Sequence, residues 1–321
     1  MLKTAESVSP KHPDKICDRI SDAILDACLE QDPHSRVAME SMGGHGLITL
    51  TGELTTNAKI DAAQIAKRVA GEQYQVNTNI VQQSSEIAQG VDVGGAGDQG
   101  IMVGYACDAN EEFVPQELYL ARNLNKLIYA KFPNDGKTQI TLRDGKICSV
   151  VASFHKAKSS ELRDIIFEWF KGKEVDSELS IYANPAGDWD IGGFDADTGV
   201  TGRKIFCDAY GPQVPVGGGA YSGKDGTKVD RSGAYMARKI AVDAVKKVGG
   251  EVLVKVAYAI GKKDPVMVSV ARPNSNEAVD FSVAGYDLSP QGIIDFLELR
   301  KPQFEKTAEW GSYGNGFKWD K

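Results

Sequence analysis

The chain has 321 residues, of which 42% are hydrophobic and 25% are charged, a composition typical of ordinary globular proteins. Its net charge of −7 argues against a nucleic-acid backbone as the main partner, and no apolar run reaches the length of a membrane-spanning helix. The N-terminus shows no signal peptide and the five cysteines show no C-x-x-C spacing, so we expect a cytoplasmic protein with buried free thiols.

Hydrophobic periodicity and turn signals predict the secondary structure. The expected elements of the first half are a helix over 14–31, strands over 36–42 and 46–55, a helix over 59–71, a strand over 101–107 and a helix over 116–131. Those of the second half are a hairpin over 138–154 with a type I′ turn at Asp144-Gly145, a helix over 160–171, strands over 179–183 and 203–209, a helix ending near 247, strands over 251–260 and 265–271, and a helix over 290–300. Pairs of strands alternate with single helices three times, so we predict an α+β protein built from three similar units.

The most distinctive segment is Gly217–Arg238, GGGAYSGKDGTKVDRSGAYMAR. Its glycines let backbone N–H groups approach an anion, and the helix N-terminus that follows favours negative charge. Lys224 and Lys228 add positive charge, and Asp230 can hold a divalent cation beside phosphates. The segment matches the first seven positions of a Walker A loop, but Asp225 stands where that loop needs Ser or Thr. We therefore predict a phosphate loop of a different kind; the alternative is a surface turn with solvated lysines.

Further charged residues recur at boundaries between loops and predicted elements. The sequence HPDK at 12–15 sets a proton donor, a carboxylate and an ammonium group at a helix N-terminus, where ordinary capping is the alternative reading. Taken singly, the other charges are better explained by loops, turns and exposed surface. Together they indicate a chain of phosphates bridged by Mg²⁺. The set comprises His12, Lys15, Lys137, Arg203, Lys204, Lys224 and Lys228, with Asp14, Asp98, Asp135, Asp197 and Asp230.

Several motifs together resemble those of the S-adenosylmethionine synthetases (methionine adenosyltransferases). They are SVSPKHPDKICDRISDAILD, TGELTT, QGVD, GAGDQG, TGVTGRK and GGGAYSGKDGTKVDRSGAYMAR, and the similarity covers nearly the whole chain. The resemblance implies three intertwined α/β-sandwich domains in a pseudo-threefold arrangement, with an N-terminal domain at 1–88, a central domain at 94–192 and a C-terminal domain at 193–321. It also implies a homodimer with active sites between the subunits, paired into a tetramer in some members.

The resemblance further implies a reaction between ATP and L-methionine. The methionine sulfur attacks C5′ of ATP and expels triphosphate, which is then hydrolysed to pyrophosphate and phosphate. A thioether sulfur needs no general base, so alignment of the substrates and stabilisation of the leaving charge lower the barrier. Two alternatives stay open: a Mg²⁺-dependent triphosphatase, and a non-catalytic nucleotide-binding subunit, against which the intact set of lysines and aspartates argues.

Individual roles follow from the matching motif positions. By resemblance the catalytic residues are His12, Lys137, Arg203 and Lys224, and His12 hydrogen-bonds the bridging region as the triphosphate leaves. The implied ATP contacts are His12, Lys15, Asp135, Lys137, Asp188, Trp189, Asp197, Arg203, Lys204, Ala220 and Lys224. The implied methionine contacts are Glu53, Gln89, Asp98, Asp197 and Lys228. The implied cofactors are Mg²⁺, held by Asp14 and Asp230, and K⁺, held by Glu40.

The chain departs from the family pattern in two places. Between Gln89 and Asp98 the family's longer gate over the active site shrinks to GVDVGGAG, so we expect reduced closure. Asp188-Trp189 replaces the usual Arg-Phe before Ile-Gly-Gly: Trp189 keeps an aromatic face for adenine, whereas Asp188 lacks the positive charge. Other loops are also shorter, which makes this chain a compact member.

Overall fold

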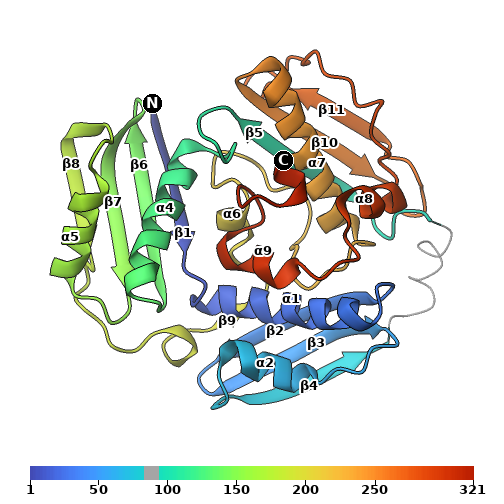
Figure 1. The fold of residues 1–321 in the computed structure, drawn as a ribbon, viewed down its shortest axis with the longest axis horizontal. Helices are drawn as coiled ribbons and strands as arrows, with labels where there is room; N and C mark the ends of the chain where they lie inside the picture. Colours follow the sequence, from blue (N-terminus) through green and yellow to red (C-terminus); the bar gives the residue numbers. More distant parts are fainter. Residues whose placement is uncertain (83–93) are drawn as a thin grey trace.

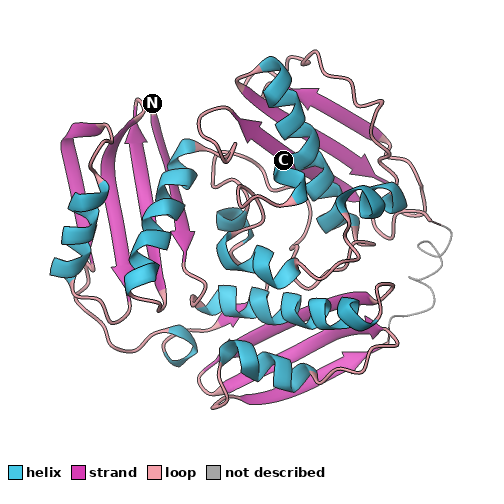
Figure 2. Cartoon of the chain, in the orientation of Figure 1, coloured by secondary structure: helices cyan, strands magenta, loops and turns pink. Residues whose placement is uncertain are grey.

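The computed structural model describes residues 1–82 and 94–321, which form three β-sheets packed with helices around a common centre (Figure 1). In each sheet the helices lie against one face (Figure 2). The short helices α6 (Ile205–Asp208) and α9 (Phe304–Trp310) lie near the centre, between the sheets. Gln89 and residues 90–93 of the predicted gate lie outside the described residues.

The first sheet has the strand order β4-β3-β2-β9 and is packed against α1 and α2. Its elements are α1 (Pro13–Gln31), β2 (Arg36–Gly44), β3 (Leu47–Thr55), α2 (Ala62–Ala70), β4 (Gln75–Val81) and the two-residue strand β9 (Gly199–Val200). Strand β3 pairs antiparallel with β2 and parallel with β4. Apolar residues of α1 recur at helical spacing, and Ile16, Ile20 and Ile24 are all buried, which explains why the predicted helix forms here.

The second and third sheets repeat this plan. The second sheet has the order β1-β6-β7-β8, from β1 (Leu2–Val8), β6 (Gly136–Arg143), β7 (Lys146–Phe154) and β8 (Val175–Ala183), with α4 (Gln116–Lys131) and α5 (Ser159–Trp169). The third has the order β11-β10-β5, from β5 (Gly100–Cys107), β10 (Glu251–Tyr258) and β11 (Met267–Ala271), with α7 (Val229–Val248) and α8 (Pro290–Leu297).

The chain connectivity reveals a threefold repeat. The order helix–strand–strand–helix occurs as α1-β2-β3-α2, as α4-β6-β7-α5 and as α7-β10-β11-α8, and in the first two units a parallel strand follows. Each hairpin also receives a strand from a distant part of the chain: β9 pairs with β2, β1 with β6 and β5 with β10. The prediction of an α+β protein of three similar units is confirmed, and the exchanged strands intertwine those units.

Most predicted elements are confirmed, including the helices α1, α4 and α7. In the β6–β7 turn Asp144 and Gly145 have φ values of 49° and 86°, as a type I′ turn requires. The predicted strand over 203–209 is wrong, because this segment forms turns and α6. Lys204 and Asp208 both bind residues of α1, and a helical turn places side chains four residues apart on the same side. Strands β1, β4 and β9 and helix α9 were not predicted.

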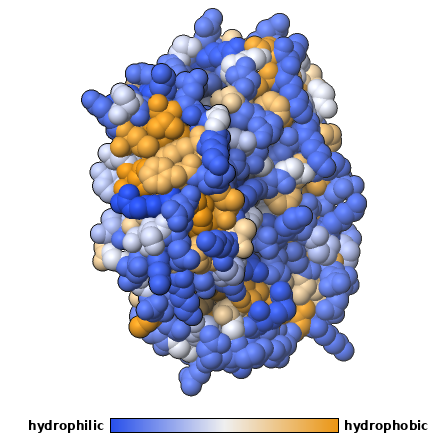
Figure 3. Space-filling model, turned by 60° about the vertical axis from the view of Figure 1, so that its left-hand side comes forward, coloured by the Kyte–Doolittle hydropathy of each residue, from blue (hydrophilic) through white to orange (hydrophobic). Residues whose placement is uncertain are grey.

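Two hydrophobic clusters form the interior. The larger one joins α1, the first sheet and the third sheet with α7, and the smaller one lies between the second sheet and its helices. The five cysteines are all buried and free, as expected. On the face shown in Figure 3, hydrophobic residues form patches separated by hydrophilic ones. Among the helices of the described residues, none combines the length and apolar character that crossing a bilayer requires.

Candidate functional site

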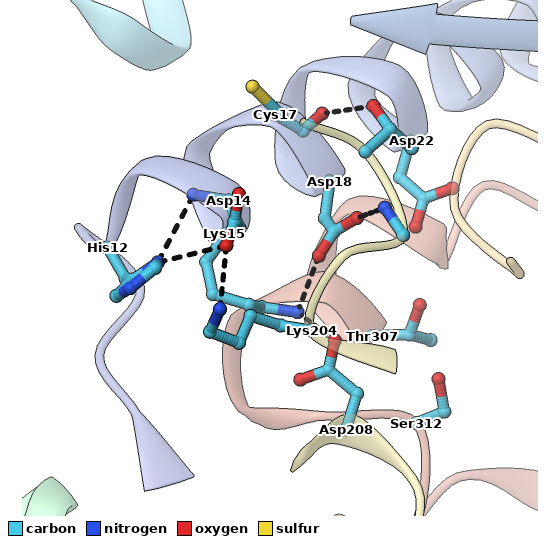
Figure 4. A network of polar contacts seen from close by, with 12 residues as sticks. His12, Asp14, Lys15, Cys17, Asp18, Asp22, Lys204, Asp208, Thr307 and Ser312 are labelled. Atoms are coloured by element: carbon cyan, nitrogen blue, oxygen red, sulfur yellow. Dashed lines mark hydrogen bonds and ion pairs between the residues drawn. The ribbon is translucent and has the colours of Figure 1, made fainter. Parts of the chain in front are cut away.

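Asp14, in the first turn of α1, binds the segment that follows β9 (Figure 4). The side chain is buried, and its Oδ1 accepts hydrogen bonds from the Val200 N–H at 2.9 Å and from Arg203 Nε at 2.8 Å. Its Oδ2 accepts from Lys204 Nζ at 2.7 Å. Burial pushes the pKa of Asp14 upward, but the hydrogen bonds from Lys204 and Val200 outweigh it and hold the pKa below its usual value. Asp14 is therefore a buried carboxylate that holds two cations.

His12 is the N-cap of α1, and its ring is buried beside Asp14. Nδ1 accepts a hydrogen bond from the Asp14 N–H at 3.2 Å, which leaves the proton of the neutral ring on Nε2. Burial, followed by the charge of Lys204, lowers the pKa of His12 to about 3. His12 can therefore act as a neutral hydrogen-bond donor through Nε2.

We expect the His12 ring to stay neutral between about pH 5 and pH 8. The ordinary pKa of a histidine is 6.5 and that of folded His12 is about 3, so only the unfolded chain gains a proton in this window. The stability from the neutral buried ring is therefore complete above pH 6.5 and is lost as the pH falls toward 3. Nitrogen-15 NMR can follow the ring, with the signal assigned by its loss in His12→Asn. A titration midpoint near pH 6.5 would contradict the expectation.

Lys15 follows Asp14 but directs its ammonium group into the protein. The side chain is 1% exposed, and Nζ binds Asp18 Oδ2 at 3.2 Å and also Asp208 of α6. Burial lowers the pKa of Lys15, but the charges of Asp208 and Asp18 outweigh it, and the net shift is upward. Burial raises the pKa of Asp18 to about 7 and that of Asp208 in the same direction. The ammonium group is thus enclosed by two carboxyl groups.

The glycine-rich segment before α7 is held against β2. The Met39 N–H donates to the Gly223 carbonyl at 3.0 Å, and Asp225, buried, accepts from the Val37 N–H at 2.7 Å. Gly223 has a φ of 80°, and a Cβ there would lie 2.0 Å from the Met39 carbonyl oxygen, so glycine is required. Asp225, which distinguishes this loop from a Walker A loop, therefore anchors it to the sheet.

The two lysines of this loop are each paired with an aspartate. Lys224 Nζ binds Asp230 Oδ2 at 2.8 Å, and the Gly219 N–H donates to Asp230 Oδ1 at 3.1 Å. Lys228, the N-cap of α7, binds Asp225 Oδ2 at 2.5 Å. The Lys224 and Asp230 side chains keep 19% and 14% of their surface exposed, so both can reach a ligand.

Glu40 and Glu53 lie beside this loop on the first sheet. Glu40 is opposite Thr51 and Glu53 is opposite Ala38, so the two carboxylates are diagonal neighbours on one face. Lys224 pairs with Ala38 through a single β-bridge, which places it next to them. Glu40 is exposed, yet partial desolvation raises its pKa. The negative charge of Glu53 acts in the same direction, whereas the positive charge of Lys224 opposes the rise.

A third set of predicted residues lies around the end of the second sheet. Asp135, buried, accepts from the Gly193 N–H at 3.0 Å, and burial raises its pKa. Lys137 is exposed on β6. Asp188 Oδ1 accepts from the Ser159 N–H at 2.8 Å, so this departure from the family pattern stabilises the start of α5.

Trp189 is half-buried, and its ring lies 5.4 Å from the His155 ring, centroid to centroid, at 32°. We expect adenine nucleotides to change its fluorescence, because a base stacked on the exposed part of the indole alters its surroundings. Trp189→Phe is the control, since it removes this indole and leaves Trp169, Trp310 and Trp319 in place. An unchanged spectrum at saturating nucleotide would count against stacking.

The structure brings the predicted residues into separate groups. The first group is His12, Asp14, Arg203 and Lys204; the second is Lys224, Lys228 and Asp230 with Glu40 and Glu53. Ala220, in the loop that carries the second group, lies next to Gly202, in the segment that carries the first. A Cβ on Gly202 would come within 2.4 Å of the Ala220 Cβ. Within the described ranges, no hydrogen bond or ion pair joins the two groups. Asp98 and Asp197 are exposed and bind the N–H of the residue that follows each of them.

Sequence reasoning missed an acidic stripe along α1. Aspartates recur every fourth residue, so they lie on one side of the helix, and each one holds another segment of the chain. Asp14 binds Arg203 and Lys204, Asp18 the Gly202 N–H, Asp22 the Gly223 N–H and Arg231, and Asp26 the N–H groups of Gln303, Phe304 and Glu305. The four-residue spacing was the signal that could have revealed it.

Fold and site together define a class: a protein of three intertwined α+β units in which cations and carboxylates are paired at the loops between those units. Family models for S-adenosylmethionine synthetase match every residue of the chain except 190: the N-terminal domain at 1–92, the central domain at 93–189 and the C-terminal domain at 191–321. The chain belongs to the S-adenosylmethionine synthetase family.

Curated relatives agree with this assignment. The chain is 38% identical to the S-adenosylmethionine synthase of Brachyspira hyodysenteriae over 375 residues, and 39% identical to that of Salinibacter ruber over 368, in each case across 99% of this chain and 95% of the relative. It is 38% identical to that of Mesoplasma florum over 367 residues, across 99% of this chain and 97% of the relative. These alignments exceed the 321 residues of this chain, so the relatives carry insertions that it lacks.

Proposed function

We propose that this protein synthesises S-adenosylmethionine from ATP and L-methionine, with release of triphosphate that is then hydrolysed to pyrophosphate and phosphate. Its family membership supports the reaction. The observation that carries the proposal is the first group, where Arg203 and Lys204 meet at a buried carboxylate within a protein of net charge −7. Such a local concentration of cations suits a polyanionic leaving group.

The residues would then act mainly on the leaving triphosphate. His12 would donate from Nε2 to the oxygen that gains charge as the C5′–O bond breaks, and Lys137, Arg203 and Lys224 would neutralise the phosphates. The remaining ATP contacts in the proposal are Asp135, Asp188, Trp189, Asp197, Lys204 and Ala220; Lys15, whose ammonium group is enclosed by Asp18 and Asp208, is left out of this set. Methionine would be held by Glu53, Asp98, Asp197 and Lys228; Gln89, which lies outside the described residues, completes that set.

The carboxylates fit magnesium that arrives with the nucleotide. Within the described ranges, no group of three or more His, Cys, Asp or Glu side chains is placed to hold a metal. Asp14 and Asp230 are instead single carboxylates, the first paired with Arg203 and Lys204 and the second with Lys224. Mg²⁺ commonly takes one or two carboxylates together with phosphate oxygens and water. When bound, it would neutralise phosphate charge. We assign Mg²⁺ to these two residues and K⁺ to Glu40.

We propose that a second copy of the chain completes each site. Among the described residues of one chain, no hydrogen bond or ion pair joins the first group to the second, and Glu40 is exposed on the first sheet beside Lys224. A homodimer would let one subunit supply the first group and its partner the second, and two dimers could form a tetramer.

We also propose the domain limits 1–88, 94–192 and 193–321 and a cytoplasmic location. The free cysteines support a reducing compartment.

One assay tests the function. The protein is incubated with ATP, Mg²⁺ and K⁺, with and without methionine, and S-adenosylmethionine, phosphate and pyrophosphate are quantified. We expect the sulfonium product only with methionine. Phosphate release without methionine and without that product would establish a triphosphatase instead, and nucleotide binding without turnover would indicate a regulatory subunit.

A further inference from the structure

Lys15 does not face the space that phosphates would occupy. Its ammonium group is buried between α1 and α6, where it binds Asp18 at 3.2 Å and also Asp208 (Figure 4). The cations that do keep exposed surface at this site are Arg203 and Lys204, with 48% and 15% of their side chains accessible. Lys15 would have to leave two carboxylates to reach a phosphate.

The segment that carries these two cations depends on contacts with α1. The Val200 N–H binds Asp14 at 2.9 Å and the Gly202 N–H binds Asp18 at 2.7 Å, which fixes the segment before Arg203. After Lys204 the chain forms only the four residues of α6. A helix this short has little stability of its own, so its position is set by tertiary contacts.

The ion pair of Lys15 with Asp208 is the contact that fixes the far end of this segment. Asp208 is the last residue of α6, and Lys15 connects it to Asp18, which also holds the Gly202 N–H. The segment is thus fastened on both sides of Arg203 and Lys204. A displacement of about 1 Å in such a segment is enough to weaken catalysis by about 100-fold.

We infer that Lys15 is a positioning residue rather than a phosphate ligand, and that Lys15, Asp18 and Asp208 form a clamp that holds Arg203 and Lys204 in place. The inference rests on the proposed function only in that phosphate groups bind at this site. Lys15 then has no direct contact with phosphate, and Asp18 and Asp208 join the residues that determine phosphate affinity.

Asp208→Asn distinguishes the two possible roles of Lys15, because each role predicts a different change in the affinity for tripolyphosphate. If Lys15 is part of a clamp, the loss of the Asp208 charge loosens α6, and inorganic tripolyphosphate binds about 10-fold more weakly. If Lys15 is a phosphate ligand, the same change frees its ammonium group, and tripolyphosphate binds as tightly as before or more tightly. Titration calorimetry without methionine measures this affinity, and it does not depend on synthesis of S-adenosylmethionine.

A second variant tests the clamp through its charge balance. Lys15→Met leaves two buried carboxylates facing each other, whereas Lys15→Met/Asp208→Asn removes that repulsion. We expect the double variant to bind tripolyphosphate several-fold more tightly than Lys15→Met; equal affinities would overturn the clamp. Lys239→Met and Lys239→Met/Asp243→Asn, at an ion pair on α7, are matched controls with no expected effect.

The kinetic readout distinguishes a positioning role from a general loss of structure. We expect Asp208→Asn to raise the KM for ATP and to leave the KM for methionine unchanged, with a thermal unfolding curve that stays cooperative. An equal rise in both KM values would overturn the clamp. A wild-type protein that binds tripolyphosphate but makes no S-adenosylmethionine would overturn the proposed function alone, and one that binds no tripolyphosphate would overturn both.

Discussion

Lys224→Ala is expected to lower kcat by about 100- to 1,000-fold, the usual cost of removing one group that stabilises charge in a transition state. Lys224 is partly exposed beside Asp230, in the position where the proposed triphosphate gains charge. The protein should stay folded, because the loop is fixed through its backbone. The Lys224 N–H donates to the Tyr221 carbonyl at 3.2 Å, and Arg231 donates to the Lys224 carbonyl at 3.0 Å. Both bonds persist in alanine.

The matched control for this variant is Lys239→Ala. Lys239 is 15% exposed and is paired with Asp243 on the same helix that follows the loop, so its ion pair resembles that of Lys224 with Asp230. Steady-state kinetics should show a loss in Lys224→Ala alone, and circular dichroism should show both variants folded. Near-normal turnover in folded Lys224→Ala would remove Lys224 from the catalytic set.

Periodicity identified most helices and hairpins because their patterns are local. Residues 14–31 and 116–131 each form an apolar helix face within the segment itself. Asp144 and Gly145 are residue types that readily adopt the positive φ values of their turn. Periodicity did not identify strands β1 and β4. Strand β1 pairs with a strand more than 100 residues later in the chain, and β4 is polar over much of its length. No local pattern reports such pairings, which explains why the exchange of strands between units could not be derived from periodicity.

The segment 203–209 shows how a local pattern can mislead. A short apolar run, 205–207, predicts a strand there. The charges at Lys204 and Asp208 instead have partners in α1, and a helical turn brings both side chains to the same side of the segment. Charge spacing of four residues was the contrary signal. The same spacing marks the aspartates of α1, whose burial is set by the loops that pack on them.

The sequence placed the charged residues of the site correctly at element boundaries, but it could not show which charges are already paired. Asp14 and Lys224 were found from their motifs, whereas Asp18 and Asp208 have no motif and acquire a role only through Lys15. Arg231 was missed for a similar reason: it lies inside α7, where an arginine is most often a solvated residue. Tertiary structure instead buries it against Asp22.

Arg231→Met is expected to lower the free energy of unfolding by about 3–5 kcal/mol, because it leaves a buried carboxylate without its cation. Arg231 and Asp22 are both fully buried and form a bidentate ion pair, with Nη1 donating to Oδ1 at 2.6 Å and Nη2 donating to Oδ2 at 2.8 Å. Asp22 also accepts from the Gly223 N–H at 2.8 Å, so the pair connects the glycine-rich loop to α1. Urea unfolding measures the loss. Arg231→Met/Asp22→Leu should recover part of it, since no buried charge remains, and a single variant within about 1 kcal/mol of wild type would show that solvent reaches this pair.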